Sequence, residues 1–160
     1  ASLLKCDVVI VGGCMVGMTL ALALSANPAL KIIVLEANPE PANFSNAHYY
    51  HRVSALALSS VRVLKSLNVW PSVQACRVSP FKSIEVYDAL NNVDLQFGAN
   101  DIGEAQLGYI VENNAIQHGL REQIARQSSI NVITPVKLIN YAETNDGCLL
   151  ETEAHGAIKA

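Results

Sequence analysis

The pattern of apolar and polar residues opens with a strand, a turn, a helix and a second strand. Apolar residues dominate 6–11, small and glycine residues follow, helix-forming residues fill 15–26, and a second apolar run covers 31–36. Continuous apolar runs are typical of parallel strands that are covered on both faces. The first part of the chain therefore predicts a right-handed βαβ unit with helices on both faces of its sheet.

The spacing of the apolar residues then changes twice along the chain. Apolar residues recur at the spacing of one helix face over 53–67, so we predict a second helix that ends near Asn68. Apolar and polar residues alternate on both sides of Asn91 and Asn92, and this predicts a half-buried β-hairpin over 82–97. Within it, Val86, Tyr87 and Phe97 are candidates for a pocket wall by position, although simple packing is the plainer role.

The last third of the chain combines a helix with short strands. A polar loop over 99–107 precedes an apolar run at 109–111, a helix over about 114–127 and a short strand over 130–133. Alternating runs around turns at 145–147 and 155–156 predict an antiparallel meander over 136–160. The fold class we predict is α/β, with a Rossmann-like parallel sheet, an antiparallel hairpin and a β-meander.

Composition excludes several classes of protein. With 160 residues, 51% of them apolar, and a net charge of −3, the chain is globular, and it lacks the basic cluster that a nucleic acid would require. The cysteines and histidines show no zinc-binding spacing, so we expect no metal site. Residues 8–30 carry no charge, but the glycine turn and Asn27-Pro28 break this run into short elements. We therefore expect a cytoplasmic protein.

The glycine-rich turn carries the first functional signal. Gly12, Gly13, Cys14, Met15 and Gly17 lie between a strand and a helix, where backbone N–H groups and the helix dipole can hold a pyrophosphate. In the fingerprint G-x-G-x-x-G, Cys14 replaces the glycine that faces the phosphates. The turn alone also fits a tight connection without a ligand, and the Cys14 thiol fits an inert as well as a reactive group.

An acidic residue at the end of the second strand supports the dinucleotide interpretation. Glu36 closes the run IIVLE, where a carboxylate can accept hydrogen bonds from both hydroxyls of an adenosine ribose. A carboxylate there also disfavours a 2′-phosphate, so FAD or NAD fits better than NADP. Arg52, on the loop before the second predicted helix, can pair with phosphate oxygens. A solvated strand end and a solvated arginine are the plainer alternatives.

Several longer strings resemble one enzyme family. DVVIVGGCMVG, VLEA, HRVSAL, LNVW and LGYIVEN are similar to segments of the ubiquinone-biosynthesis flavin hydroxylases, which belong to the FAD-dependent aromatic monooxygenases related to p-hydroxybenzoate hydroxylase. The resemblance covers nearly the whole chain. It implies an enzyme that uses FAD, NAD(P)H and O₂ to hydroxylate the ring of a polyprenylated phenol or quinol.

The resemblance also implies roles for single residues. Gly12, Cys14, Met15 and Gly17 would border the pyrophosphate, and Glu36 would hold the ribose. Arg52 would lie near the pyrophosphate or ribityl chain, and Asn113 would touch the ribityl chain, a role compatible with capping the helix from Asn114. No catalytic side chain is expected, because the cofactor carries the chemistry.

The family pattern finally suggests a division of the chain. Residues 1–80 and 108–160 correspond to an incomplete FAD-binding domain, and 81–107 to the start of the substrate-domain sheet. The later D-G and G-D motifs of the family do not occur, so the chain resembles the N-terminal part of a longer enzyme and is expected to be inactive by itself. A lipidic substrate makes peripheral contact with a membrane or a biosynthetic complex a hypothesis, while the oligomeric state stays open.

Two other functions remain open at this stage. Cys14 can obstruct the pyrophosphate, in which case the chain is a non-catalytic dinucleotide-binding or scaffold module. An NAD-dependent dehydrogenase domain is the other alternative, although the hairpin over 82–97 interrupts the α/β alternation that such a domain needs.

Overall fold

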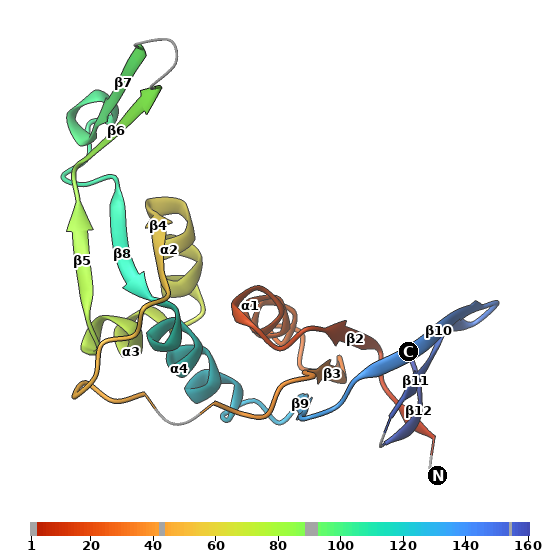
Figure 1. Ribbon diagram of the computed structural model, residues 1–160. Coiled ribbons are helices and arrows are strands. Elements are labelled where there is room, and N and C mark those ends of the chain that lie inside the picture. Colours follow the sequence, from red (N-terminus) through yellow and green to blue (C-terminus); the bar gives the residue numbers. More distant parts are fainter. Residues whose placement is uncertain (1–2, 42–43, 89–92, 154) are drawn as a thin grey trace. The chain divides into compact units, whose positions relative to one another are not determined.

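The chain folds into two compact units. The structure, a computed structural model, describes residues 3–41, 44–88, 93–153 and 155–160. Ala1–Asn43 and Leu120–Ala160 form the first unit, and Phe44–Gly119 form the second (Figure 1). These bounds follow contacts within the chain and do not test the predicted division into cofactor and substrate domains.

A parallel sheet forms the centre of the first unit. Its three strands lie in the order β2 (Val8–Val11), β3 (Ile32–Leu35) and β9 (Ile130–Ile133). Helix α1 (Met15–Leu24) connects β2 to β3, so the βαβ unit is confirmed. Every residue of β3 is buried, as expected for the central strand of a covered parallel sheet.

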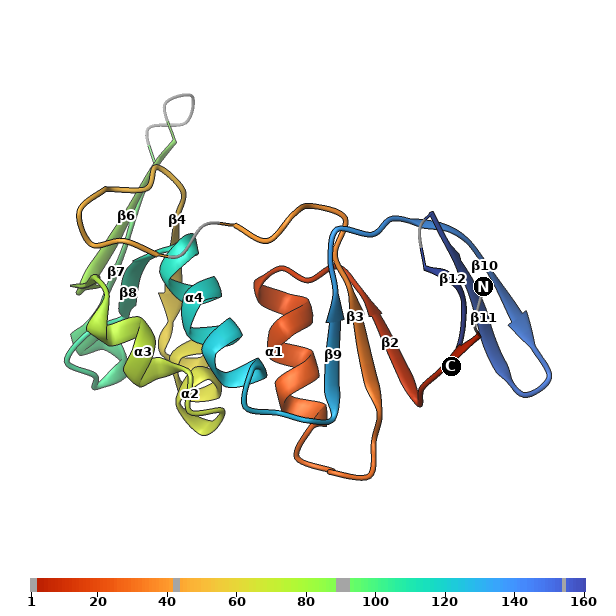
Figure 2. The same ribbon diagram turned by 90° about the horizontal axis from the view of Figure 1, so that it is seen from below.

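Different elements cover the two faces of this sheet. Helix α1 lies along one face, where it packs on β2 and β3 (Figure 2). On the other face, Ile33 and Leu35 pack against Leu150 and Ile158 of a second sheet. The prediction of helices on both faces is therefore wrong, because the apolar side of an antiparallel sheet buries this surface instead.

The second sheet is the predicted meander. It contains β10 (Leu138–Thr144), β11 (Gly147–Thr152) and β12 (Gly156–Lys159), paired antiparallel in sequence order. The short strand β1 (Leu4–Lys5) pairs parallel with β12. The strand predicted over 6–11 therefore begins later, at Val8, and Cys6 and Asp7 connect β1 to β2.

An antiparallel sheet organises the second unit. Strand β8 (Gly108–Glu112) lies between β4 (Val53–Ala57) and β5 (Val78–Phe81). Helices α2 (Leu58–Ser66) and α3 (Trp70–Ala75) follow β4, and α4 (Asn113–Ile124) begins directly after β8. The buried Trp70 ring packs on Tyr109 of β8 with 5.1 Å between the ring centroids.

The helix predicted over 53–67 begins later than its apolar spacing suggested. Val53–Ala57 form a strand in register with Glu112–Gly108, and exposure alternates along it. Val53 and Ala57 are four residues apart, which fits a helix face as well as alternate positions of a strand. Pairing with β8 decides between the two. Helix α3 was not predicted from the sequence, although a proline at the start of a segment, here Pro71, is a typical helix signal.

The predicted β-hairpin is present, but its apolar face is exposed and not buried as predicted. It consists of β6 (Ser83–Asp88) and β7 (Val93–Gly98), and its turn at Asn91-Asn92 lies outside the described residues. A short 3₁₀ helix (Ala99–Ile102) follows. The apolar residues of one face are 43–53% exposed, namely Ile84, Val86, Leu95 and Phe97. Two strands alone cannot build a core.

Candidate functional site

The glycine turn joins β2 to α1 by a conformation that needs glycine at two positions. Gly12 has φ of +110°, a region that side-chain-bearing residues rarely adopt. A Cβ atom on Gly17 would lie 1.9 Å from the carbonyl oxygen of Gly12. The helix therefore approaches the turn as closely as a residue without a side chain allows.

The N-terminus of α1 is open to an anion. Cys14 is the N-cap residue; its side chain is exposed and makes no hydrogen bond to the helix, while its carbonyl oxygen accepts one from the Met18 N–H at 3.0 Å. No acidic residue lies in the first turn, which begins at Met15. Because the first N–H groups of a helix lack partners within it, they and the helix dipole favour a negative ligand here.

Glu36 lies beside this turn, directly after β3. Its Oε2 accepts a hydrogen bond of 2.8 Å from the Gly13 N–H. Its Oε1 accepts hydrogen bonds from the backbone N–H and the side-chain amide of Asn38, at 2.8 and 2.9 Å. Desolvation by partial burial raises the pKa of Glu36, but these hydrogen bonds together outweigh it and hold the pKa below its ordinary value. The carboxylate is therefore charged at neutral pH.

Gly13 allows Glu36 to lie this close. A Cβ atom on Gly13 would stand 2.8 Å from the Cβ of Glu36, which is nearer than such atoms approach in proteins. The turn and the acidic residue thus form one hydrogen-bonded group.

Arg121 is a charged neighbour of this group that the sequence analysis missed. It lies in the last turn of α4, in the first unit, and is half buried. Desolvation lowers the pKa of Arg121, whereas electrostatic interactions, the largest of them with Glu40, raise it. Arg121 is therefore within electrostatic reach of the turn. The sequence around Arg121 contains no motif that would have indicated this proximity to the turn.

The other two predicted site residues lie together in the second unit. The Asn113 N–H donates a hydrogen bond of 2.9 Å to the carbonyl oxygen of Arg52. The Ser54 hydroxyl donates one of 2.6 Å to Asn113 Oδ1. Helix α4 begins at Asn113, one residue earlier than predicted, and the Asn113 side chain bonds to Ser54 of β4. The structure thus groups the predicted residues into two sets, one in each unit.

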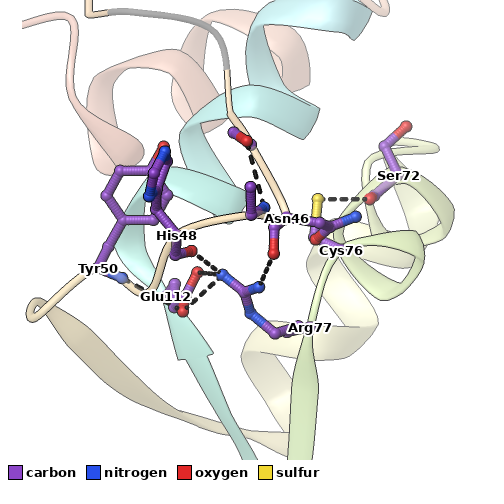
Figure 3. Close-up of polar contacts among 9 residues, drawn as sticks. Asn46, His48, Tyr50, Ser72, Cys76, Arg77 and Glu112 are labelled. Carbon is purple, nitrogen blue, oxygen red and sulfur yellow. Dashed lines mark hydrogen bonds and ion pairs between the residues drawn. The ribbon is translucent and has the colours of Figure 1, made fainter.

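A cluster around Arg77 was also not predicted. Arg77 and Glu112 form an ion pair of 3.0 Å, and the side chain of Glu112 is only 8% exposed (Figure 3). They contribute to the wall of an open pocket of about 540 Å³, whose other lining residues are Tyr49, Val53, Gln74, Cys76, Val78, Ser79 and Ile110. An arginine and a glutamate far apart in the sequence carry no motif, so pattern analysis could not pair them.

The described residues form neither a metal-binding cluster nor a membrane-spanning helix. Among the described residues, no three His, Cys, Asp or Glu side chains group closely enough to hold a metal ion. Within the same part of the chain, no helix is long and apolar enough to span a membrane.

Known proteins resemble the chain over most of its length. It is 33% identical over 141 residues to the mitochondrial ubiquinone biosynthesis monooxygenase COQ6 of Xenopus tropicalis, a match that covers 85% of this chain and 30% of that protein. It is 34% identical over 155 residues to 3-demethoxyubiquinol 3-hydroxylase of Escherichia coli, covering 96% of this chain and 39% of that protein. No family model matches.

Solved structures confirm the fold. The flavin-dependent monooxygenase PieE, solved with FAD and substrate, superposes with a TM-score of 0.75 at 14% identity and covers all of this chain and 30% of its own. The anhydrotetracycline hydroxylase OxyS of Streptomyces rimosus gives 0.75 at 16% identity, covering 98% of this chain and 30% of its own. The Rossmann-like α/β fold class is thus confirmed.

The sequence matches are more specific than the similarity in fold. The chain spans between 30% and 39% of the length of these two curated relatives. The strings that suggested the resemblance are distributed over the same nearly complete span of this chain. Over about a third of the relatives' length, the chain is therefore similar in sequence to monooxygenases and hydroxylases of ubiquinone biosynthesis.

Proposed function

We propose that the chain is the FAD-binding, N-terminal part of an aromatic-ring hydroxylase. The hydrogen bond of 2.8 Å from the Gly13 N–H to Glu36 carries this proposal, because it joins the phosphate turn to the ribose-binding acid. The names of the relatives supply the reaction class, and the turn supplies a place for the cofactor.

The donors and acceptors of the turn fit the adenosine half of FAD. The Glu36 carboxylate accepts hydrogen bonds from Gly13 and Asn38, and a carboxylate oxygen can accept more than one. We infer that it would also accept a hydrogen bond from the ribose. A charged carboxylate also repels a 2′-phosphate, which disfavours NADP at this turn. FAD is preferred to NAD on the similarity to flavin monooxygenases.

Cys14 is compatible with a pyrophosphate. Its side chain is exposed and leaves the first N–H groups of α1 without a side-chain cap. A phosphate would therefore find donors at Met15 and Val16, and the sulfur would narrow the approach without closing it. Gly12, Gly13, Cys14, Met15 and Gly17 are the proposed phosphate-binding residues, with Glu36 at the ribose and with Arg52 and Asn113 toward the ribityl chain.

In this proposal, FAD would carry out the oxygen transfer, and the protein would bind and orient FAD. Bound FAD would supply oxygen transfer to an electron-rich ring, with NAD(P)H as reductant and O₂ as oxygen source. The described residues would bind and orient FAD. From the names of the relatives, we propose a polyprenylated phenol or quinol of ubiquinone synthesis as substrate. Such a lipidic substrate would favour peripheral contact with a membrane, and co-sedimentation of the full-length protein with lipid vesicles tests this.

The absorption spectrum of the purified full-length protein tests the proposed function directly. A bound flavin, present after purification or after addition of FAD, is the expected result. Acceleration of NAD(P)H oxidation by a candidate phenol, coupled to ring hydroxylation, would then identify the substrate class. A colourless protein that also rejects added FAD would favour the alternative, a scaffold module whose phosphate turn is obstructed by Cys14.

A further inference from the structure

In the second unit, Arg77 connects the loop over 46–48 to Glu112 at the end of β8. Its Nη1 donates a hydrogen bond of 2.7 Å to the carbonyl oxygen of Asn46, and its Nη2 donates to the carbonyl oxygen of His48 (Figure 3). The same Nη2 contacts both carboxylate oxygens of Glu112, at 3.0 and 3.1 Å. The guanidinium also stacks on Tyr49, 4.3 Å from the ring centroid.

The segment that Arg77 holds leads directly to Arg52. Residues 44–50 contain no helix or strand. Their path depends on a turn at Ser45 and on side-chain contacts such as those of Arg77. The Tyr50 N–H adds a hydrogen bond of 3.4 Å to Glu112 Oε1. Arg77 and Glu112 together therefore attach this segment to the end of β8. The segment ends two residues before Arg52, which immediately precedes β4.

Glu112 transmits the same constraint to Asn113. It is the last residue of β8, and Asn113 is the first residue of α4. Asn113 in turn holds Arg52 through a backbone hydrogen bond of 2.9 Å. A shift of the Glu112 carboxylate would thus move both residues that are proposed to contact the flavin half of FAD.

The cluster is poorly designed for stability alone. Among the described residues, Arg77 Nε is a buried side-chain nitrogen without a hydrogen-bond partner. Buried ion pairs often stabilise a fold no better than apolar residues of the same volume, and an orphan donor weakens them further. What the arginine offers and an apolar residue does not is a fixed geometry between two carbonyl oxygens and a carboxylate.

We propose that Arg77 is a positioning residue for FAD, which acts through Glu112 and residues 46–50 to hold Arg52 and Asn113 in place. The inference rests on the proposed function, because it assigns the flavin half of FAD to these two residues. Arg77 itself touches neither the cofactor nor the substrate in this account.

The Arg77→Lys variant of the full-length protein tests the proposal. Lysine keeps the charge that compensates buried Glu112 but cannot bridge the two carbonyl oxygens and the carboxylate together. We expect the Kd for FAD, measured by flavin fluorescence, to rise about tenfold. The visible circular dichroism of the saturated flavin should change as well, because its surroundings are altered. Arg62→Lys, in the exposed pair with Glu104, is the matched control and should behave as wild type.

Hydrogen exchange without FAD separates this proposal from the proposed function. Amides of residues 46–50 and of Asn113 should exchange faster in Arg77→Lys than in Arg62→Lys. If Arg77→Lys does not fold, the double variant Arg77→Met and Glu112→Gln, which removes both charges, takes its place. An unchanged Kd and an unchanged flavin spectrum would overturn the positioning role, whatever the melting temperature. A wild-type protein that does not bind FAD would overturn the proposed function, while the exchange data still report whether Arg77 holds the segment.

Discussion

The backbone N–H of Asn113 lies 2.9 Å from the carbonyl oxygen of Arg52, to which it donates a hydrogen bond. This bond extends the pairing of β4 with β8 by one step, since Val53 is paired with Glu112 in the ladder. Two residues that the family resemblance singled out separately are therefore joined through the backbone. Both residues lie at the same end of this strand pair.

Ser54→Ala tests whether this arrangement orients Asn113 toward a ligand. The Ser54 hydroxyl donates to Asn113 Oδ1 at 2.6 Å, and the amide nitrogen of Asn113 is the group that we propose to donate to the ribityl chain. Loss of one such hydrogen bond is worth about 0.5–1.5 kcal/mol, and we expect FAD affinity to fall severalfold. Titration of the full-length protein with FAD measures this. Unchanged affinity would mean that Asn113 does not contact the cofactor.

Gly17→Ala tests the close approach of α1 to the turn. The added methyl group would lie 1.9 Å from the Gly12 carbonyl oxygen, so the helix must move outward. Overpacking of this kind costs about 1–3 kcal/mol, and it should also weaken FAD binding because the donor N–H groups shift. Chemical denaturation and FAD titration measure the two effects. Leu20→Ala on the same helix, where the side chain lies beyond the first turn and is 48% exposed, should leave FAD binding nearly unchanged.

Glu36→Gln tests the charge beside the turn. Although desolvation opposes it, hydrogen bonding from Asn38 and Gly13 lowers the pKa of Glu36 in the folded state. Its stabilising contribution is therefore fully present above the ordinary carboxyl pKa and is lost as pH falls through the lower folded value. Wild type should be the more stable at neutral pH, and the difference should shrink in acid. Chemical denaturation against pH measures it, with Glu153→Gln at an exposed position as the control.

The βαβ unit could be predicted because its signals are local. The apolar runs, the glycines at 12 and 17 and the acid at 36 each fix a feature of the backbone within a few residues. Strand β4 could not be predicted, since Val53 and Ala57 fit a helix face equally well and only pairing with β8 decides. The same holds for the meander, whose strands were visible while its packing on Ile33 and Leu35 was not.

The candidate site likewise contains residues that the sequence could locate and contacts that it could not. Glu36 follows from its place after a strand, but the hydrogen bond from Gly13 that holds it is a tertiary contact. Arg77 and Arg121 gave no signal at all, because their partners lie on other elements and no spacing connects them. Sequence therefore locates the residues offered to a cofactor, whereas the structure is needed to find those that hold them.

Cys14→Gly tests whether the departure from the glycine fingerprint matters. The thiol is exposed at the N-cap of α1 and adds a Cβ and a sulfur where the fingerprint has neither. Because glycine is itself tolerated at an N-cap, stability should change by less than about 0.5 kcal/mol. FAD should bind as in wild type or more tightly, as measured by titration of the full-length protein.

Cys14→Ala is the matched control for this substitution, because it keeps the Cβ atom and adds no oxygen that could cap the N–H groups of the helix. It should bind FAD nearly as wild type does, so that a larger gain in Cys14→Gly reports the space released at the phosphates. Weaker binding by the glycine variant than by the alanine variant would show that the side chain supports the cofactor instead of narrowing its approach. If all three proteins reject FAD while remaining folded, the turn is no phosphate site, and the scaffold interpretation replaces the hydroxylase.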